Sequence, residues 1–142
     1  MMADESNSLR VRLVSPERIL FDTTVEAVEL PAKNGYMEVL FGHAPLMAEL
    51  GAGDVRLHSG REGGDQLYNV SWGFVEVLPD RVTILANDAL KPEEIDVPRA
   101  EQQMEQGQKQ WREAGDSEEK YAEALHRIAE AEAKLATARE KH

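Results

Sequence analysis

From Leu9 to about Asp88, apolar and polar residues alternate in short runs that are rich in β-branched side chains. In the run Leu9–Leu13, two arginines separate three apolar residues, so an extended chain has one polar and one apolar face. This period predicts half-buried β-strands. The runs that show it are Leu9–Leu13, Val25–Leu30, Val55–Leu57, Phe74–Val77 and Val82–Ile84.

Clusters of glycine, proline, asparagine and aspartate separate these runs, as is typical of tight turns. The predicted turns are 32–35, 51–54, 61–65 and 79–80. Because the strands recur about every 8 to 12 residues without a helical pattern between them, an antiparallel β-sandwich or barrel is favoured over an α/β fold. We assign it to residues 9–90, after a disordered arm at residues 1–8.

After Pro92 the apolar spacing becomes helical, and alanine, glutamate, glutamine, lysine and arginine dominate. We expect an antiparallel αα-hairpin in residues 91–142, with helices at about 97–113 and 117–140. Asp96 is the expected N-cap of the first helix, and Gly115 is expected to end it in the left-handed conformation. Asp116 and Glu119 have the spacing of a capping box at the start of the second helix.

The two helices carry few large apolar residues. The predicted apolar positions are Ala100, Met104, Gly107 and Trp111 in the first helix, and Tyr121, Leu125, Ile128 and Leu135 with Ala131 and Ala138 in the second. A glycine inside a helix costs about 1 kcal/mol relative to alanine. We therefore expect the hairpin to be conditionally stable and to depend on packing against the sandwich or another chain.

Composition narrows the classes of partner. Sixteen basic and 27 acidic residues give a net charge of −11, which opposes nucleic acids and anionic membrane surfaces. There is no cysteine, which fits a reducing cytoplasm. The longest apolar runs, such as Ile19–Phe21, have three residues, far fewer than the roughly 20 that span a bilayer. Any attachment to a membrane is therefore expected through another molecule.

No catalytic group or metal site is recognisable from spacing. His43 lies in the loop Gly42–Pro45 without a nucleophile elbow, and His58, His126 and His142 have no ligand spacing with one another. We therefore expect no catalytic residue, no metal and no required cofactor. The segment Ile95–Ala100 has a second interpretation besides capping, because a helix N-terminus with Arg99 suits an anionic or nucleotide group.

Several segments, in this order, resemble the epsilon subunits of F-type ATP synthases. They are Leu13–Arg18, Gly42–Leu46, Gly51–Arg56, Ser71–Val77 and Val82–Ala86, followed by Ile95–Asp96 and the αα-hairpin. Two segments depart from the pattern of the family. Residues 35–41 differ from the usual Gly-Glu-Phe-Gly-Ile-Leu-Pro, and Trp72 replaces the first glycine of a Ser-Gly-Gly-Phe stretch.

The resemblance implies a non-catalytic rotor subunit in the central stalk. Its sandwich would bind the gamma subunit and rest on the polar loops of the c-ring, coupling proton-driven rotation to ATP synthesis at the cytoplasmic face of the bacterial plasma membrane. Its hairpin would reach the alpha and beta subunits and inhibit ATP hydrolysis. The residues expected to face the c-ring are Lys33, Asn34, Gly35, His43 and Pro45.

The resemblance also offers regulatory ATP as a ligand, with Asp96, Arg99 and Arg127 as its contacts. Nucleotide-binding relatives have a further arginine on the second helix, where this chain has Ala131 one turn after Arg127. The next basic residue is Lys134, and a lysine cannot reproduce a bidentate guanidinium contact. The phosphate-binding set is therefore incomplete.

Two alternatives remain open from the sequence. The first is a stand-alone β-sandwich that binds a small ligand or acts as an adaptor, with the helices covering a sheet edge. The second is an enzyme, for which only His43 and scattered carboxylates are at hand. Co-purification with gamma separates the rotor hypothesis from the first alternative, and an assay for hydrolase activity tests the second.

Overall fold

The computed structural model describes residues 8–60 and 64–141 and divides into two compact units, Met1–Lys91 and Pro92–His142. Two expectations fall largely outside the described residues. Of the arm predicted at residues 1–8 only Ser8 is described, and of the turn predicted at residues 61–65 only Gly64 and Asp65 are described.

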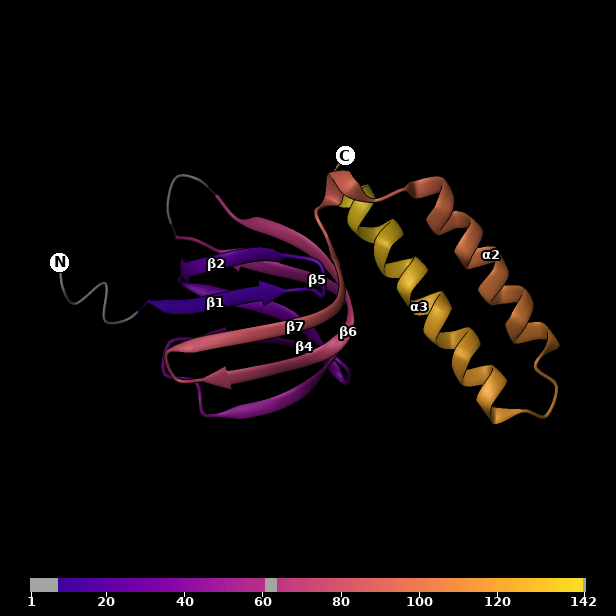
Figure 1. Ribbon diagram of the computed structural model, residues 1–142, viewed down its shortest axis with the longest axis horizontal. Helices are drawn as coiled ribbons and strands as arrows, with labels where there is room; N and C mark the ends of the chain where they lie inside the picture. The colour runs from indigo at the N-terminus through magenta and orange to yellow at the C-terminus, as the bar shows by residue number, and fades with distance from the viewer. Residues whose placement is uncertain (1–7, 61–63, 142) are drawn as a thin grey trace. The chain divides into compact units, whose positions relative to one another are not determined.

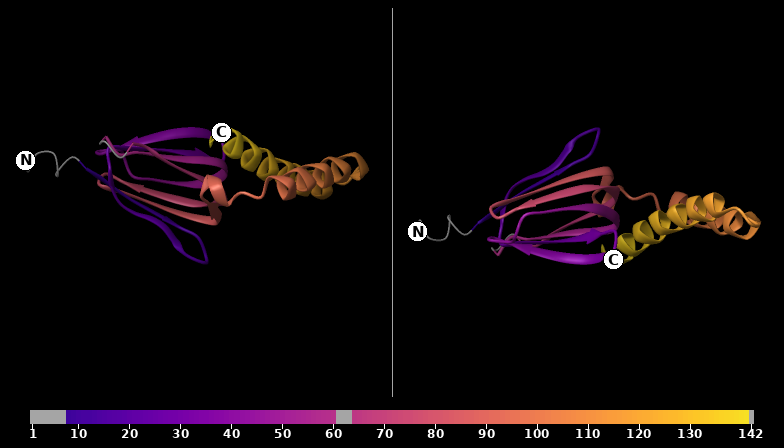
Figure 2. Two further views of the ribbon diagram at one scale, coloured as in Figure 1. Left: turned by 90° about the horizontal axis from the view of Figure 1, so that it is seen from above. Right: turned by 90° about the horizontal axis from the view of Figure 1, so that it is seen from below.

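Within the described residues, seven strands form the N-terminal unit (Figure 1). Their order in the sheet is β2-β1-β7-β6-β5-β3-β4, and every neighbouring pair is antiparallel except β1 and β7. The β1–β2 and β3–β4 hairpins form the two ends of this order and lie on opposite layers (Figure 2). The predicted antiparallel sandwich followed by two helices is confirmed. The strands are β1 (Leu9–Val14), β2 (Ile19–Val25), β3 (Ala27–Ala32), β4 (Gly35–Leu40), β5 (Leu46–His58), β6 (Gln66–Leu78) and β7 (Arg81–Leu90).

The apolar pattern does not indicate β2 or β4 as separate strands, although both are present. They are the edge strands of the sheet and bury few side chains. In β4 only Val39 is buried, and in β2 only Phe21 and Val25 are. Because alternation in sequence reflects burial of one face, an edge strand with so little buried surface gives a weak signal.

The core lies between the two layers. In each of β5, β6 and β7, the face of the strand that is buried switches to the opposite face at one point along the strand. Leu50, Gly73 and Ala86 are direct neighbours on β5, β6 and β7. Gly73 has φ +131°, and a β-carbon there would overlap the carbonyl oxygen of Leu85. Only glycine fits at this close approach between strands. The largest fully buried side chains are Leu9, Leu13, Leu30, Leu50, Leu57 and Ile84.

The turn predicted at residues 51–54 is wrong, because β5 runs through this segment. Gly53 is buried, and a β-carbon on it would overlap the Tyr36 hydroxyl and lie 2.9 Å from Pro31 Cβ. The backbone N–H of Asp54 donates to that hydroxyl at 3.0 Å. Gly53 therefore makes room for the Tyr36 side chain, and it does not reverse the chain.

The C-terminal unit begins with the short 3₁₀ helix η1 (Pro92–Glu94), followed by the antiparallel pair α2 (Val97–Glu113) and α3 (Glu118–Lys141) (Figure 1). Asp96 caps α2 as predicted, since its Oδ1 accepts from the backbone N–H of Arg99 at 3.1 Å. Gly115 has φ +60° after α2, also as predicted. At α3 the prediction is wrong, because Ser117 Oγ accepts from Lys120 N at 3.2 Å and is the N-cap in place of Asp116.

The buried residues of the helices are small. Leu125 is 54% exposed, so its predicted place on the packed face is wrong. Trp111 is 47% exposed and lies edge-on to Tyr121, with ring centroids 5.9 Å apart. Alanines spaced by seven residues take the place of the expected large side chains on α3. The buried residues of this unit are Ala100, Gly107, Ala114, Ala124, Ala131, Thr137 and Ala138.

Candidate functional site

The turn at Lys33 and Asn34 joins β3 to β4 and is exposed. Gly35, which follows, has φ +138°, a conformation that favours glycine. The backbone N–H of Lys33 donates to the carbonyl oxygen of Glu49 at 2.9 Å, and its Nζ lies 3.1 Å from Glu49 Oε2. The turn is therefore tied to β5 while its polar atoms remain accessible.

His43 and Pro45 lie in the loop that joins β4 to β5. The Nδ1 atom of His43 donates to the carbonyl oxygen of Ala44 at 2.7 Å, and the backbone N–H of Gly42 donates to Pro79 at 2.7 Å. The imidazole thus stabilises its own loop. This arrangement supports a structural role for His43 and offers no partner for nucleophilic catalysis.

The structure does not bring these two segments together. They lie at opposite ends of β4, whose six residues span about 20 Å at the usual rise per residue. The Lys33–Gly35 turn and the His43–Pro45 loop therefore form separate surfaces, and the c-ring contact of each stays a prediction.

An apolar patch lies on the outer face of β5, β6 and β7. We define it as Met47, Phe74 and Leu85, which are 67%, 54% and 52% exposed. Phe74 and Leu85 are direct cross-strand neighbours, and Met47 is diagonal to Phe74 on the same face. Large apolar side chains gathered on one exposed face are typical of a protein interaction site. Phe41 and Leu46, in or next to the His43 loop, are 41% and 39% exposed.

The helical unit holds the three residues expected to contact ATP. Asp96 uses a carboxylate oxygen to cap α2, and the Arg99 side chain is exposed. Gln103 lies one helical turn after Arg99 on α2. Its side-chain amide donates to the carbonyl oxygen of Arg127 on α3 at 3.4 Å, so Arg127 lies across from this turn of α2. An open pocket of about 430 Å³ beside Arg127 is lined also by Ala122, Glu123, His126 and Glu130. Two of these side chains are acidic and oppose a triphosphate.

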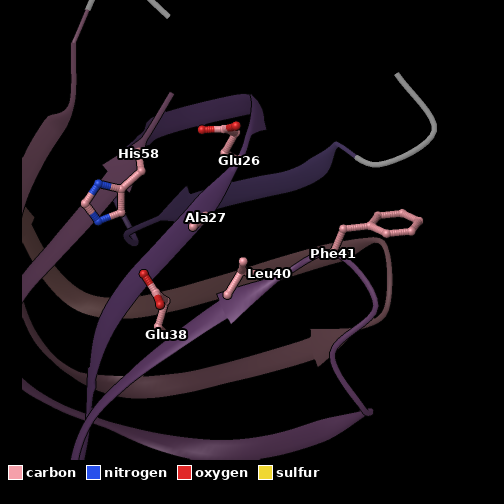
Figure 3. A pocket seen from close by; sticks show the side chains of 6 residues that line it. All are labelled: Glu26, Ala27, Glu38, Leu40, Phe41 and His58. Atoms are coloured by element: carbon pink, nitrogen blue, oxygen red, sulfur yellow. The ribbon is translucent and has the colours of Figure 1, made fainter. Parts of the chain in front are cut away.

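A cluster of ionisable side chains, carboxylates and one imidazole, lies on the outer face of β3, β4 and β5. Glu29 and Glu38 are directly opposite each other on β3 and β4. His58 Nε2 lies 2.6 Å from Glu29 Oε2, and His58 Nδ1 lies 2.8 Å from Asp65 Oδ2. One ligand atom from each of Glu29, Glu38 and His58 lies within 4.8 Å of the others. Glu26, Glu38 and His58 are among the residues that line an open pocket of about 500 Å³. Figure 3 shows their side chains.

The hydrogen bond to the Glu29 carboxylate raises the pKa of His58 above its usual value. Partial burial acts in the opposite direction, and Asp65 raises the pKa further through its hydrogen bond and its charge. The two carboxylates therefore favour the protonated form of His58.

Sequence reasoning missed this cluster because its members are far apart in the chain. The four histidines have no ligand spacing with one another, and the sequence alone does not place carboxylates of neighbouring strands beside His58. The register that joins Glu29 to Glu38 and sets His58 beside them is a property of three paired strands. The polar residues Glu29, Glu38 and His58 interrupt apolar strands and could have indicated a site, but only once the pairing of their strands is known.

Within the part of the chain that the structure describes, no helix is long and apolar enough to cross a membrane.

Comparisons of this chain with known proteins match one family. The family described as ATP synthase, Delta/Epsilon chain, beta-sandwich domain, matches residues 8–92. An ATP synthase epsilon chain from Solibacter usitatus is 40% identical over 135 residues, covering 95% of this chain and 98% of the relative. That from Bacillus subtilis is 43% identical over 94 residues, covering 66% and 70%.

Two solved structures share the fold. A chain of the Euglena gracilis mitochondrial ATP synthase, in a structure of OSCP, F1 and c-ring, has a TM-score of 0.75 at 22% identity, covering 92% of this chain and 81% of that one. A chain of the Tetrahymena thermophila central stalk and c-ring has a TM-score of 0.66 at 13% identity, covering 92% and 96%. From the matched domain and the identity to the Solibacter chain, this chain belongs to the family of ATP synthase epsilon chains, which are non-catalytic rotor subunits of the central stalk.

Proposed function

We propose that the N-terminal unit joins the gamma subunit to the c-ring and uses a different surface for each. Membership of the epsilon family supports the rotor role, and the observation that carries the assignment of surfaces is the separation of the Lys33–Gly35 turn from the His43–Pro45 loop by β4. In this proposal the chain is held at the cytoplasmic face of the bacterial plasma membrane through those other subunits.

We assign the gamma contact to the apolar patch and the adjoining His43–Pro45 loop. Interfaces that persist through a working cycle have a buried apolar centre with a polar rim. Met47, Phe74 and Leu85 supply such a centre, and Phe41 and Leu46 extend it toward the loop. This assignment moves His43 and Pro45 from the c-ring side to the gamma side.

The c-ring contact is assigned to Lys33, Asn34 and Gly35. These residues form an exposed polar turn, which suits the short polar loops of a membrane ring better than an apolar patch does. The ion pair of Lys33 with Glu49 holds the turn without covering it.

Substitution of Phe74 tests the gamma contact. Phe74→Lys places a charge at the centre of the apolar patch, and we expect affinity for isolated gamma to fall about tenfold or more. Thr23→Lys makes the same change of charge at an exposed position of β2 and serves as the matched control. Equal binding by both variants, with unchanged melting temperatures, would refute the assignment.

Cross-linking tests the two ends of β4. The chain has no cysteine, so Asn34→Cys and Ala44→Cys each introduce a single reactive thiol. In the assembled synthase we expect the thiol at position 34 to cross-link to the c-ring and the thiol at position 44 to cross-link to gamma. Cross-links to the c-ring from both positions would restore the single-end expectation and contradict this proposal.

We further propose that the C-terminal hairpin regulates ATP hydrolysis through the alpha and beta subunits and that ATP binding to this chain is weak. The weakness is inferred from Asp96 acting as a helix cap and from Glu123 and Glu130 beside Arg127. Titration of the full chain with ATP, followed by hairpin amide shifts, tests this. We expect no saturation up to low-millimolar ATP. Saturating shifts that Arg99→Ala and Arg127→Ala abolish, but Arg112→Ala retains, would overturn it.

A further inference from the structure

The cluster of Glu29, Glu38 and His58 places two carboxylates and one imidazole on neighbouring strands. Glu29 has Arg56 opposite it on β5 and Glu38 opposite it on β4. Like charges directly opposite on paired strands are destabilising. Among the described residues, the side chain of Glu38 has neither a hydrogen bond nor an ion pair. Glu38 also lines an open pocket, together with His58 and Glu26 (Figure 3).

We propose that Glu29, Glu38 and His58 form a binding site for a divalent transition metal, with Zn²⁺ as the best match. The set offers one imidazole nitrogen and carboxylate oxygens from two residues, which is the borderline mixture of ligands that zinc accepts. Three protein ligands leave a fourth position for water, which the open pocket provides. The absence of cysteine from the chain removes thiolate sites that would compete for the metal.

The distances suit such an ion. A tetrahedral zinc with bonds of about 2.1 Å places its ligand atoms about 3.4 Å apart. The three candidate atoms already lie within 4.8 Å of one another, so rotation about side-chain bonds is sufficient. The backbone needs no movement, because β3, β4 and β5 fix the three Cα positions by their pairing.

Asp65 acts as a positioning residue for the imidazole. Metal-binding histidines commonly donate their other ring N–H to a carboxylate, which fixes the tautomer and directs the free lone pair at the metal. His58 has this arrangement, with Nδ1 at 2.8 Å from Asp65 Oδ2 and Nε2 at 2.6 Å from Glu29 Oε2. Without metal, a proton joins Nε2 to Glu29 Oε2. On binding, that proton leaves to solvent and the Nε2 lone pair binds the ion.

Isothermal titration of the full, chelator-treated chain with zinc chloride tests the site. We expect one saturable ion per chain at micromolar zinc, and no saturation with magnesium chloride over the same range. His58→Gln and Glu38→Gln should each weaken binding about tenfold or more, and Asp65→Asn by about tenfold. His126→Gln removes a histidine of the helical unit and should leave the affinity unchanged.

Loss of zinc binding in Glu38→Gln cannot be attributed to misfolding, because Glu38 is exposed and its side chain makes no hydrogen bond or ion pair with another described residue. Amide shifts on zinc addition should centre on residues of β3, β4 and β5. The proposal is overturned if zinc does not saturate below millimolar concentration, if Glu38→Gln and His58→Gln bind as the parent does, or if His126→Gln abolishes binding. Gamma binding plays no part in these measurements, so they are independent of the stalk assignment.

Discussion

Gly107 of α2 lies against Ile128 of α3, so closely that a β-carbon at Gly107 would stand 2.7 Å from Ile128 Cγ1. The same β-carbon would lie 3.4 Å from the backbone nitrogen of Ile128 and 3.5 Å from the carbonyl oxygen of Ala124. A glycine that weakens an isolated helix therefore lets the two helices of the hairpin approach.

Replacement of Gly107 by alanine should destabilise the hairpin by about 1 kcal/mol. The gain of about 1 kcal/mol in helix propensity is smaller than the roughly 1 to 3 kcal/mol that overpacking costs. Helical melting followed by circular dichroism measures the net effect. In an Ile128→Ala background, where the neighbouring side chain is shortened, Gly107→Ala should instead be stabilising. A destabilising effect of equal size in both backgrounds would show that the contact is not responsible.

Ser117→Ala should destabilise α3 by about 1 kcal/mol, because the Lys120 N–H loses its capping acceptor. Asp116→Ala is the matched control and should change the helical melting temperature much less. The reverse order of effects would make Asp116 the cap and restore the capping box with Glu119.

Gly73→Ala should prevent stable folding of the N-terminal unit, with a loss of about 3 kcal/mol or more. The new methyl group overlaps the Leu85 carbonyl oxygen, and the φ of +131° is unfavourable for alanine. Gly64→Ala is the control, because Gly64 also has a positive φ, +74°, but no atom beyond its two chain neighbours lies within 4 Å of its added β-carbon. Its cost in urea denaturation should be about 1 kcal/mol. Similar stability of the two variants would exclude the overlap as the cause.

The hairpin should open at a much lower free energy than the sandwich. Its buried side chains are mostly alanine, whereas the sandwich buries a cluster that includes Leu9, Leu13, Leu30 and Ile84. Since stabilisation by burial follows the apolar area removed from water, the larger side chains protect the sheet more. Native-state hydrogen exchange on the full chain provides the measurement, and equal protection in α3 and β6 would contradict the expectation.

The sequence was sufficient for those parts of the fold that depend on neighbours along the chain. Alternation in Leu9–Leu13 predicts a strand, and the Asp96 cap and the Gly115 stop are set by residues within one turn. Gly53 could not be interpreted in this way. It is buried in β5 because Tyr36 crosses it from β4, and that contact becomes visible only when the sheet is formed.

Of the candidate surfaces, one can be predicted from neighbouring residues in the sequence and two require the strand pairing. The exposed turn at Lys33 and Asn34 follows from its polar residues and Gly35. The apolar patch could not be predicted, because Phe74 and Leu85 look like core residues until their strands are paired and their outward face is known. The Glu29 and His58 cluster requires the register of β3 against β5 and leaves no mark in sequence spacing.

The single buried residue of β4 limits how this chain can vary. Val39 reaches the core only while its position in the strand has the right parity, and inserting one residue before it would turn it to the outside. The length of β4, which separates the Lys33 turn from the His43 loop, can therefore change only by two residues at a time, roughly 7 Å. If the turn and the loop contact the c-ring and gamma as proposed, homologues with partners of slightly different size should differ in the composition of the turn and loop, and keep the length of the strand between them.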